Sequence, residues 1–465
     1  MNRMSPLDAS FLHVEDDVNH MHIGSVGVFE GPPPSYQDFV RMTAGKLPLV
    51  PRYRQKVRSV PLDIGRPLWV DDPHFNIGYH VRHTALPAPG GTDELRNLVG
   101  RLMSQQLDRS KPLWEMWMVE GLEEGYWALI SKVHHCMVDG VAGTDLLTVL
   151  LDAQPEPAPP AEDTWSPVPE PTNVRVVTDA LVERAVSPYE QFRSLRATLR
   201  QPRQILDRGR DVVRGAAAMA GVVRPTPESS LNGPIGPHRR WAWARTTLAD
   251  VKTIRSTLGG TVNDVVLTAI SRGFRELLLG RGEQIGADRV VRTLVPVSVR
   301  TPGERGEYNN KVSGVIAELP VGIEDPRQRL AAIRAQMDEI KETNQAVAAE
   351  VLTSLSGFTP PMLLALGTRA ATRFARRFAQ RNVNTVTTNV PGPQMPLYAV
   401  GRKMLEVFPY VPLAAPVRIG VAIFSYDGKL SFGVTGDYDT AADIEVLCRG
   451  IEDGITELQK AGNEG

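Results

Sequence analysis

The chain has 465 residues, of which 42% are hydrophobic and 23% are charged, and its formal net charge is −1. A chain of this length is expected to form two or three domains, and the composition is ordinary for a globular enzyme. The near-zero charge excludes a general electrostatic attraction to nucleic acid or acidic lipid. Only two cysteines occur, which excludes a disulfide framework or a thiolate metal site and favours a reducing cytoplasm.

Residues 1–153 alternate between strand and helix patterns and are predicted to form the first domain, with no apolar secretion signal at the start. The predicted elements are a strand at residues 25–31, a helix at 91–108, a strand pair at 116–122 and 126–133, and a helix at 141–151. Helical spacing predicts one buried face on the first helix. Its residues are Leu95, Leu98, Leu102 and Met103.

Residues 154–240 are predicted to connect this domain to a second one. Residues 154–172 are rich in proline and poor in aliphatic side chains, which is typical of a stiff, extended linker. Residues 184–224 are rich in arginine and carry an apolar stripe. Such a segment either lies as an amphipathic helix on an anionic membrane or forms a solvated connector, and the sequence favours neither.

Residues 241–465 repeat the α/β pattern and are predicted to form the second domain. Strands are predicted at residues 290–300, 312–319 and 384–393, and a hairpin at 418–439. Thr261 followed by Asp264 resembles a capping box, and Asp427–Gly428 is typical of a hairpin turn. The buried face of the capped helix is expected to contain Val265, Val266, Ala269, Ile270 and Phe274.

The longest uncharged run, residues 351–368, has 18 residues and so reaches the lower limit for a membrane span. Because Pro360 and Pro361 interrupt the run, an interrupted core or interfacial helix is predicted instead. The basic residues 369–381 follow directly. We therefore hypothesise that residues 358–381 form an interfacial helix; the alternative is an amphipathic helix packed on the second domain.

The string HHCMVDG begins at His134, where the second strand of the predicted pair ends. Adjacent side chains on a strand point to opposite faces, so His134 and His135 are poorly placed to share a metal ion. No G-x-S-x-G nucleophile elbow occurs, and Cys136 is expected to be a small core residue. General base catalysis needs only one imidazole, with an ordinary pKa of about 6.5. Asp139 would tie down the loop, and Gly140 would allow a tight turn or close approach of a ligand. The alternative, that the string forms a structural corner with no catalytic role, stays open.

This string resembles the H-H-x-x-x-D-G signature of the bacterial wax ester synthase/acyl-CoA:diacylglycerol acyltransferase family, and in particular of mycobacterial-type triacylglycerol synthases. The family belongs to the CoA-dependent acyltransferase superfamily. Further blocks resemble the family in their expected order along nearly the whole chain. They are SPLDASFLHVED, PLWEMWMVEGL, SSLNGPIG, TVNDVVLTAI, RTLVPVSVR, TNVPGP and GDYD.

The resemblance implies a role for each matching residue. His135 would be the general base that removes the acceptor hydroxyl proton, and His134 would support the motif. Asp139 would hold the loop, paired with Arg300. Asn263, near a helix N-terminus, would stabilise the oxyanion or position the hydroxyl. Helix capping is the alternative for Asn263 and the expected supporting role for Asp264.

The resemblance also implies an α/β fold of two chloramphenicol-acetyltransferase-like halves, each a mixed sheet with helices, with an active-site tunnel between them. Long-chain acyl-CoA would be the co-substrate and diacylglycerol or a long-chain alcohol the acceptor. No tightly bound cofactor, metal or nucleic-acid partner is expected. Peripheral association with the inner face of the cell membrane or with lipid droplets is expected. The alternatives are an acyltransferase with a different acceptor and a catalytically weak paralogue that binds lipid droplets.

Overall fold

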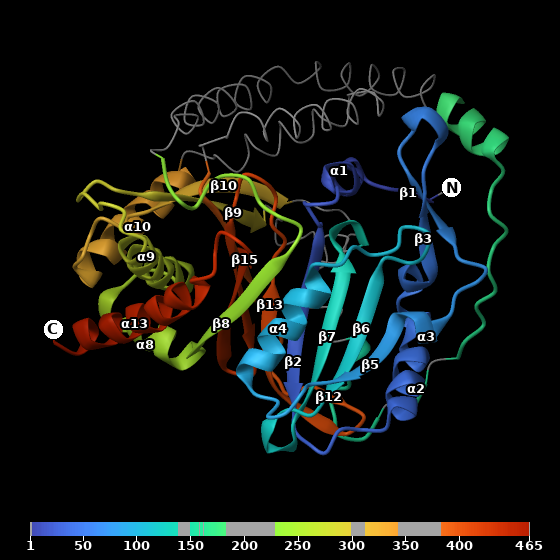
Figure 1. Ribbon diagram of the computed structural model, residues 1–465, viewed down its shortest axis with the longest axis horizontal. Coiled ribbons are helices and arrows are strands. Elements are labelled where there is room, and N and C mark those ends of the chain that lie inside the picture. Colours follow the sequence, from blue (N-terminus) through green and yellow to red (C-terminus); the bar gives the residue numbers. More distant parts are fainter. Residues whose placement is uncertain are drawn as a thin grey trace.

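The computed structural model describes residues 2–137, 149–157, 159–160, 162–182, 228–298, 312–342 and 383–464. Two six-stranded sheets lie side by side, with helices packed against them (Figure 1). Each sheet contains both parallel and antiparallel pairs. The α/β class with two mixed sheets, predicted from the sequence, is therefore confirmed.

The first sheet is built around the strand that ends in the histidine doublet. In spatial order its strands are β12 (Tyr398–Ala399), β13 (Arg402–Tyr410), β2 (His22–Phe29), β7 (Trp127–His134), β6 (Trp114–Glu120) and β5 (Val81–Ala85). The predicted β6–β7 pair is antiparallel, as expected. Its nearby helices are α1 (Pro6–Val14), α2 (Tyr36–Lys46), α3 (Ile77–His80) and α4 (Thr92–Met103). All four residues predicted on the buried face of α4 are buried.

The two faces of β7 contact different parts of the protein. Trp127, Leu129 and Val133 belong to one hydrophobic cluster, which also contains Phe39 of α2. Ala128 and Ile130 point the other way, into a cluster with residues of α4. This alternation is the ordinary period of two of a strand buried on both faces. It places Lys132 and His134 on the α4 side.

In the described part of the chain, four helices lie beside the second sheet (Figure 1). Its strand order is β10 (Val312–Leu319), β9 (Val291–Ser298), β11 (Thr385–Val390), β14 (Ile419–Tyr426), β15 (Lys429–Asp437) and β8 (Arg239–Thr247). The helices are α8 (Leu248–Leu258), α9 (Val262–Gly280), α10 (Pro326–Glu342) and α13 (Ile444–Asn463). The predicted capping box, buried helix face and hairpin are confirmed. Asp427 and Gly428 both have positive φ, as a tight hairpin turn requires.

Smaller elements complete the first half. A three-stranded sheet has the order β1 (Asn2–Arg3), β4 (Leu68–Asp71) and β3 (Gln55–Arg58). The 3-10 turns are η1 (Leu47–Leu49), η2 (Pro51–Arg54), η3 (Pro61–Asp63), η4 (Glu123–Gly125) and η5 (His135–Met137). The described residues of the proline-rich linker form no helix or strand, and they are fastened to this half. Arg54 forms two hydrogen bonds with Asp163, at 2.8 and 2.6 Å, and Arg58 pairs with Glu170 at 2.8 Å.

The two halves are joined by a crossover of C-terminal strands into the first sheet and by aromatic packing. β13 follows β11 in the chain but pairs with β2, so a C-terminal strand completes the first sheet. Trp241 and Trp243 of β8 pack with Phe408 of β13 in the cluster that also holds α4. A Cβ on Gly433 would lie 1.7 Å from the Pro409 carbonyl oxygen, so the strands approach too closely for any larger residue. The domain boundaries at residues 153 and 240 stay a prediction.

Three predicted segments lie wholly or largely outside the described residues. They are the helix at 141–151, the basic segment 184–224 and the interfacial helix at 358–381. Among the helices that are described, none is long and apolar enough to cross a membrane.

Candidate active site

The histidine doublet lies where β7 leaves the sheet. His134 is the last residue of β7 and pairs with His22 of β2, and its N–H donates to the Leu113 carbonyl at 3.0 Å. The N–H of His135 donates to the Met21 carbonyl at 2.8 Å, and the 3-10 turn η5 begins at this residue. The main chain therefore fixes both histidines, while the change from strand to turn separates their side chains.

His135 is half-buried and carries a neutral imidazole. Its ring is stacked on Phe11 of α1, with ring centroids 4.0 Å apart and an interplanar angle of 22°. Burial is the main reason that the pKa of His135 is lowered from 6.5 to about 4. The buried Nδ1 has no hydrogen-bond partner in the part of the chain that the structure describes. At neutral pH this imidazole is available to accept a proton.

His134 is fully buried and holds the turn together. Its Nδ1 accepts a hydrogen bond from the backbone N–H of Cys136 at 3.1 Å. An accepting Nδ1 carries no proton, so the proton of a neutral ring is on Nε2. That nitrogen lies 3.4 Å from Oε2 of Glu15. The side chain of His134 thus links α1 to the turn that carries His135.

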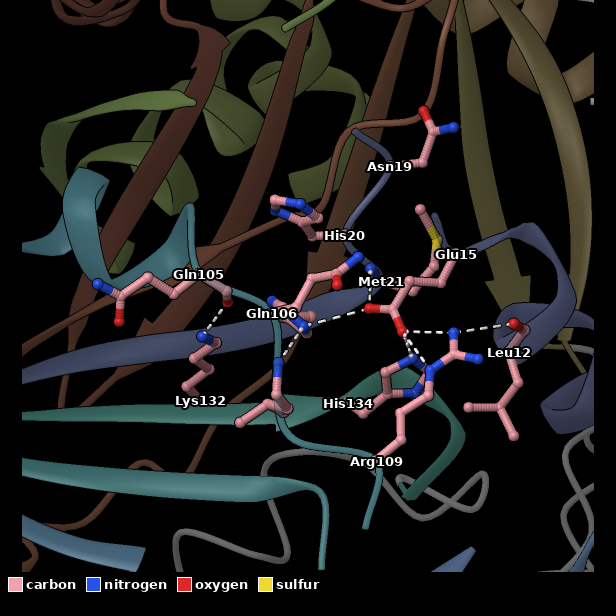
Figure 2. A network of polar contacts seen from close by, with 12 residues as sticks. Leu12, Glu15, Asn19, His20, Met21, Gln105, Gln106, Arg109, Lys132 and His134 are labelled. Carbon is pink, nitrogen blue, oxygen red and sulfur yellow. Dashed lines mark hydrogen bonds and ion pairs between the residues drawn. The ribbon is translucent and has the colours of Figure 1, made fainter. Parts of the chain in front are cut away.

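Glu15, just after α1, is the centre of a buried polar network (Figure 2). Arg109 donates to Oε2 at 2.6 and 3.1 Å, the N–H of Met21 donates to Oε1 at 3.3 Å, and His22 Nε2 lies 3.2 Å from Oε1. Burial by itself would raise the pKa of Glu15, but hydrogen bonds with His134 and His22 outweigh it. The pKa of this carboxyl lies far below its usual value, so the group is a carboxylate.

Other titratable groups surround this network. Burial lowers the pKa of His22 to about 3 and that of Lys132 to about 8, and it also lowers the pKa of His20. The ammonium group of Lys132 donates to the carbonyl of Leu102 at 2.9 Å. It also donates to the carbonyl of Gln105 (Figure 2). Leu102 lies in the last turn of α4, where backbone acceptors lack helical partners, and Gln105 lies two residues beyond the end of the helix. Lys132 is therefore a structural cap.

The network of Glu15 was not predicted from the sequence. A signal was present, because three of the nine histidines, His13, His20 and His22, fall within ten residues of one another around Glu15. Spacing alone does not show that this N-terminal stretch lies against the doublet. The contact between α1 and η5 brings the two segments together.

Asn263 and Asp264 have separate roles in the second half. Asp264 accepts a hydrogen bond from the N–H of Thr261 at 2.7 Å, so it completes the capping box of α9. Asn263 Oδ1 instead accepts from Nδ2 of Asn389 at 3.4 Å. Val390, the next residue of β11, packs against the hydrophobic cluster that contains Cys136 and Met137. Asn263 is thus tied to a strand whose end reaches the first half near the doublet.

The remaining predicted site residues divide into two groups. Asp139, Gly140 and Arg300 lie outside the described residues, and the Asp139–Arg300 pairing stays a prediction. Cys136 is buried, as expected, and burial raises the pKa of its thiol well above the ordinary value, which leaves no thiolate nucleophile there. Within the described ranges no three His, Cys, Asp or Glu side chains are grouped as metal ligands.

Comparisons with known proteins agree with the resemblance in the sequence. Residues 4–266 match the wax ester synthase/diacylglycerol acyltransferase catalytic domain, and residues 308–459 match the C-terminal domain of the same family. A probable diacylglycerol O-acyltransferase of Mycobacterium tuberculosis is 38% identical over 98% of this chain and 96% of its own length. A second, putative diacylglycerol O-acyltransferase of that organism is 32% identical over 98% of this chain and 91% of its own length.

Solved structures show the same fold. The wax ester synthase/diacylglycerol acyltransferase of Marinobacter aquaeolei superposes with a TM-score of 0.69 and 24% identity over the full length of both chains. The starter condensation domain of rhizomide synthetase, solved in complex with C8-CoA, gives a TM-score of 0.58 at 14% identity over 100% of this chain and 94% of its own. With both family domains matched in order along the sequence, the chain belongs to the wax ester synthase/diacylglycerol acyltransferase family.

Proposed function

We propose that this protein transfers the acyl group of a long-chain acyl-CoA to the hydroxyl of diacylglycerol, and also of long-chain alcohols, forming triacylglycerol or wax ester. The family membership and the names of the relatives support this activity. The observation that carries the mechanism is the half-buried, neutral imidazole of His135 at the end of β7. A base of this kind needs no metal and no enzyme-bound intermediate.

His135 acts as the general base in a direct transfer. It removes the proton of the acceptor hydroxyl while the oxygen attacks the thioester carbonyl carbon. The resulting tetrahedral oxyanion collapses, the carbon–sulfur bond breaks, and the CoA thiolate takes the proton back from His135. The products are the ester and free CoA. The buried thiol of Cys136 plays no part, because it has no thiolate to offer.

Asn263 stabilises the oxyanion from the second half. Its Oδ1 is occupied by Asn389, so the amide Nδ2 is the group left to donate a hydrogen bond. The residue is second in α9, a helix of 19 residues, and the positive end of the helix dipole adds to the stabilisation of negative charge. His134 and Asp139 would support the loop that follows His135.

The acceptor is a lipid, so the protein works at a membrane or lipid-droplet surface on the cytoplasmic side. The basic residues 369–381 would provide the contact. Changing Arg373, Arg376 and Arg377 together to Glu should abolish flotation with anionic liposomes. Flotation that survives the three changes would contradict this contact.

The activity is tested by incubating the purified protein with radiolabelled palmitoyl-CoA and one acceptor at a time. We expect triacylglycerol from diolein and wax ester from hexadecanol, with one molecule of CoA released per ester. If ester forms from hexadecanol alone, the proposed mechanism stands, but the main acceptor is a long-chain alcohol. Product only with an amine or a diol would favour a different acyltransferase of the superfamily. Binding of lipid without any product would favour the lipid-droplet-binding paralogue.

A further inference from the structure

We propose that Phe11 is a positioning residue for His135, and that its ring keeps water away from one face of the imidazole so that the acyl group goes to the acceptor hydroxyl. This inference rests on the proposed acyl transfer. It concerns the partition between two nucleophiles, the acceptor alcohol and water, at the same thioester.

The geometry of the pair is that of a stacked dimer of rings. The centroids are 4.0 Å apart and the planes are tilted by only 22°, so the phenyl ring lies over one face of the imidazole. Rotation of the imidazole about its Cβ–Cγ bond would break this contact. Aromatic stacking of this kind favours one orientation of the ring, in addition to the free energy gained from the buried apolar area. The base therefore presents its nitrogens in a fixed plane.

Phe11 is itself held firmly. α1 is capped by Ser5, whose Oγ accepts from the N–H of Asp8 at 3.1 Å. At the other end the N–H of Glu15 donates to the Phe11 carbonyl at 3.1 Å. Residues four apart lie on the same side of a helical turn, so Phe11 and Glu15 face the doublet together. Phe11 contacts His135 while Glu15 contacts His134, and α1 thus sets the position of both histidines.

The contact between Phe11 and His135 bears on which nucleophile, water or the acceptor alcohol, attacks the thioester. Water is a competing nucleophile in any acyl transfer, and His135 can activate a water molecule as readily as an alcohol. Attack by water on the thioester carbonyl carbon, with His135 taking and returning the proton, yields a free fatty acid and CoA. Exclusion of water from the reacting groups is a general means of suppressing this side reaction. The stacked phenyl ring occupies the space above the imidazole, where water would otherwise collect, and it fixes the plane in which the nitrogen lone pairs point.

The inference is tested with Phe11→Leu, which keeps apolar bulk and removes the flat ring, and with Phe11→Tyr, which keeps the ring. The protein is incubated with radiolabelled palmitoyl-CoA and diolein, and the amounts of ester and free fatty acid are measured. In Phe11→Leu we expect the ratio of fatty acid to ester to rise on the order of tenfold. The KM for palmitoyl-CoA should not change, and Phe11→Tyr should restore the ratio of the unmodified protein.

A matched control separates this role from simple packing. Phe29 is stacked on Trp127 at 4.4 Å in the same half but has no contact with His135, so Phe29→Leu should lower stability and leave the ratio unchanged. If Phe11→Leu does not fold, Phe11→Met provides the same comparison. A folded Phe11→Leu or Phe11→Met protein with an unchanged ratio would overturn the inference, and so would a Phe11→Tyr ratio as high as that of Phe11→Leu. Failure of the unmodified protein to form any ester would instead overturn the proposed function.

Discussion

Nδ1 of His134 accepts the backbone N–H of Cys136 at 3.1 Å, so the first histidine of the doublet closes the turn on which the second one is carried. The two adjacent histidines therefore differ in environment. His134 is fully buried between Glu15 and the turn, whereas His135 is half-buried beneath an aromatic ring. This difference predicts that replacing each one will have a different effect.

His134→Ala should reduce stability more than His135→Ala. It leaves the Cys136 N–H without its acceptor, removes one contact of Glu15 Oε2 and creates a cavity, at a cost of about 2–4 kcal/mol. His135 has no hydrogen bond from Nδ1 to lose, so His135→Ala should change the free energy of unfolding by less than about 1.5 kcal/mol. Urea denaturation of the two variants makes the comparison, and equal losses would contradict the assignment of His134 as the structural residue.

Glu15→Gln tests the buried network of which this carboxylate is the centre. The change keeps the shape but removes the charge that Arg109 and the two histidines face, so stability should fall by about 1–3 kcal/mol and acyl transfer should fall with it. Asp17→Asn, two residues away at an exposed position, is the matched control and should behave like the unmodified protein. Unchanged stability in Glu15→Gln would mean that the network does not support the fold.

Much of the scaffold around the doublet could be predicted from local patterns. The β6–β7 pair, the buried face of α4, the capping box of α9 and the Asp427–Gly428 turn each depend on residues close in sequence. The entry of β13 into the first sheet could not be predicted, because strand pairing across the whole chain has no local signature.

The residues that surround the candidate site could not be predicted from the sequence for the same reason. Phe11 and Glu15 meet the doublet only because α1 packs on η5, a contact between segments far apart in the chain. The motif pointed to both His134 and His135, but only their contacts in the structure show that their environments differ. The residues that complete the motif, Asp139 and Gly140, lie outside the described part of the chain.

The pH dependence of the reaction should reflect the buried position of His135. Its pKa of about 4 lies below the ordinary 6.5, with burial as the main cause and the neighbouring His134 also lowering it. The base stays unprotonated as pH falls from 8 to 6, so kcat/KM should be constant over this range and decline only toward pH 4. Initial rates with palmitoyl-CoA and hexadecanol, measured where the protein remains folded, give the profile. A decline centred near pH 6.5 would show that the imidazole is open to water.

Stability should fall in acid through the buried His22 of the network. Burial holds the pKa of His22 at about 3, below the 6.5 of the unfolded chain, so the unfolded chain binds the proton more tightly. The stabilisation is complete above pH 6.5 and is lost as pH falls toward 3. Each such histidine contributes a slope of up to about 1.4 kcal/mol per pH unit. Urea denaturation between pH 7 and 4.5 should show a smaller slope for His22→Gln, and an unchanged one for the exposed control His238→Gln. Equal slopes in all three proteins would contradict burial of a neutral His22.

The most direct test of the account is ester formation from palmitoyl-CoA and diolein by the unmodified protein and by His135→Ala, with acyl-CoA binding measured in parallel. Loss of a general base should lower the rate by a factor of about 10² to 10⁴ while binding and folding are retained. Equal rates in the two proteins would contradict the central claim, since the doublet would then be a structural corner and another group would remove the proton.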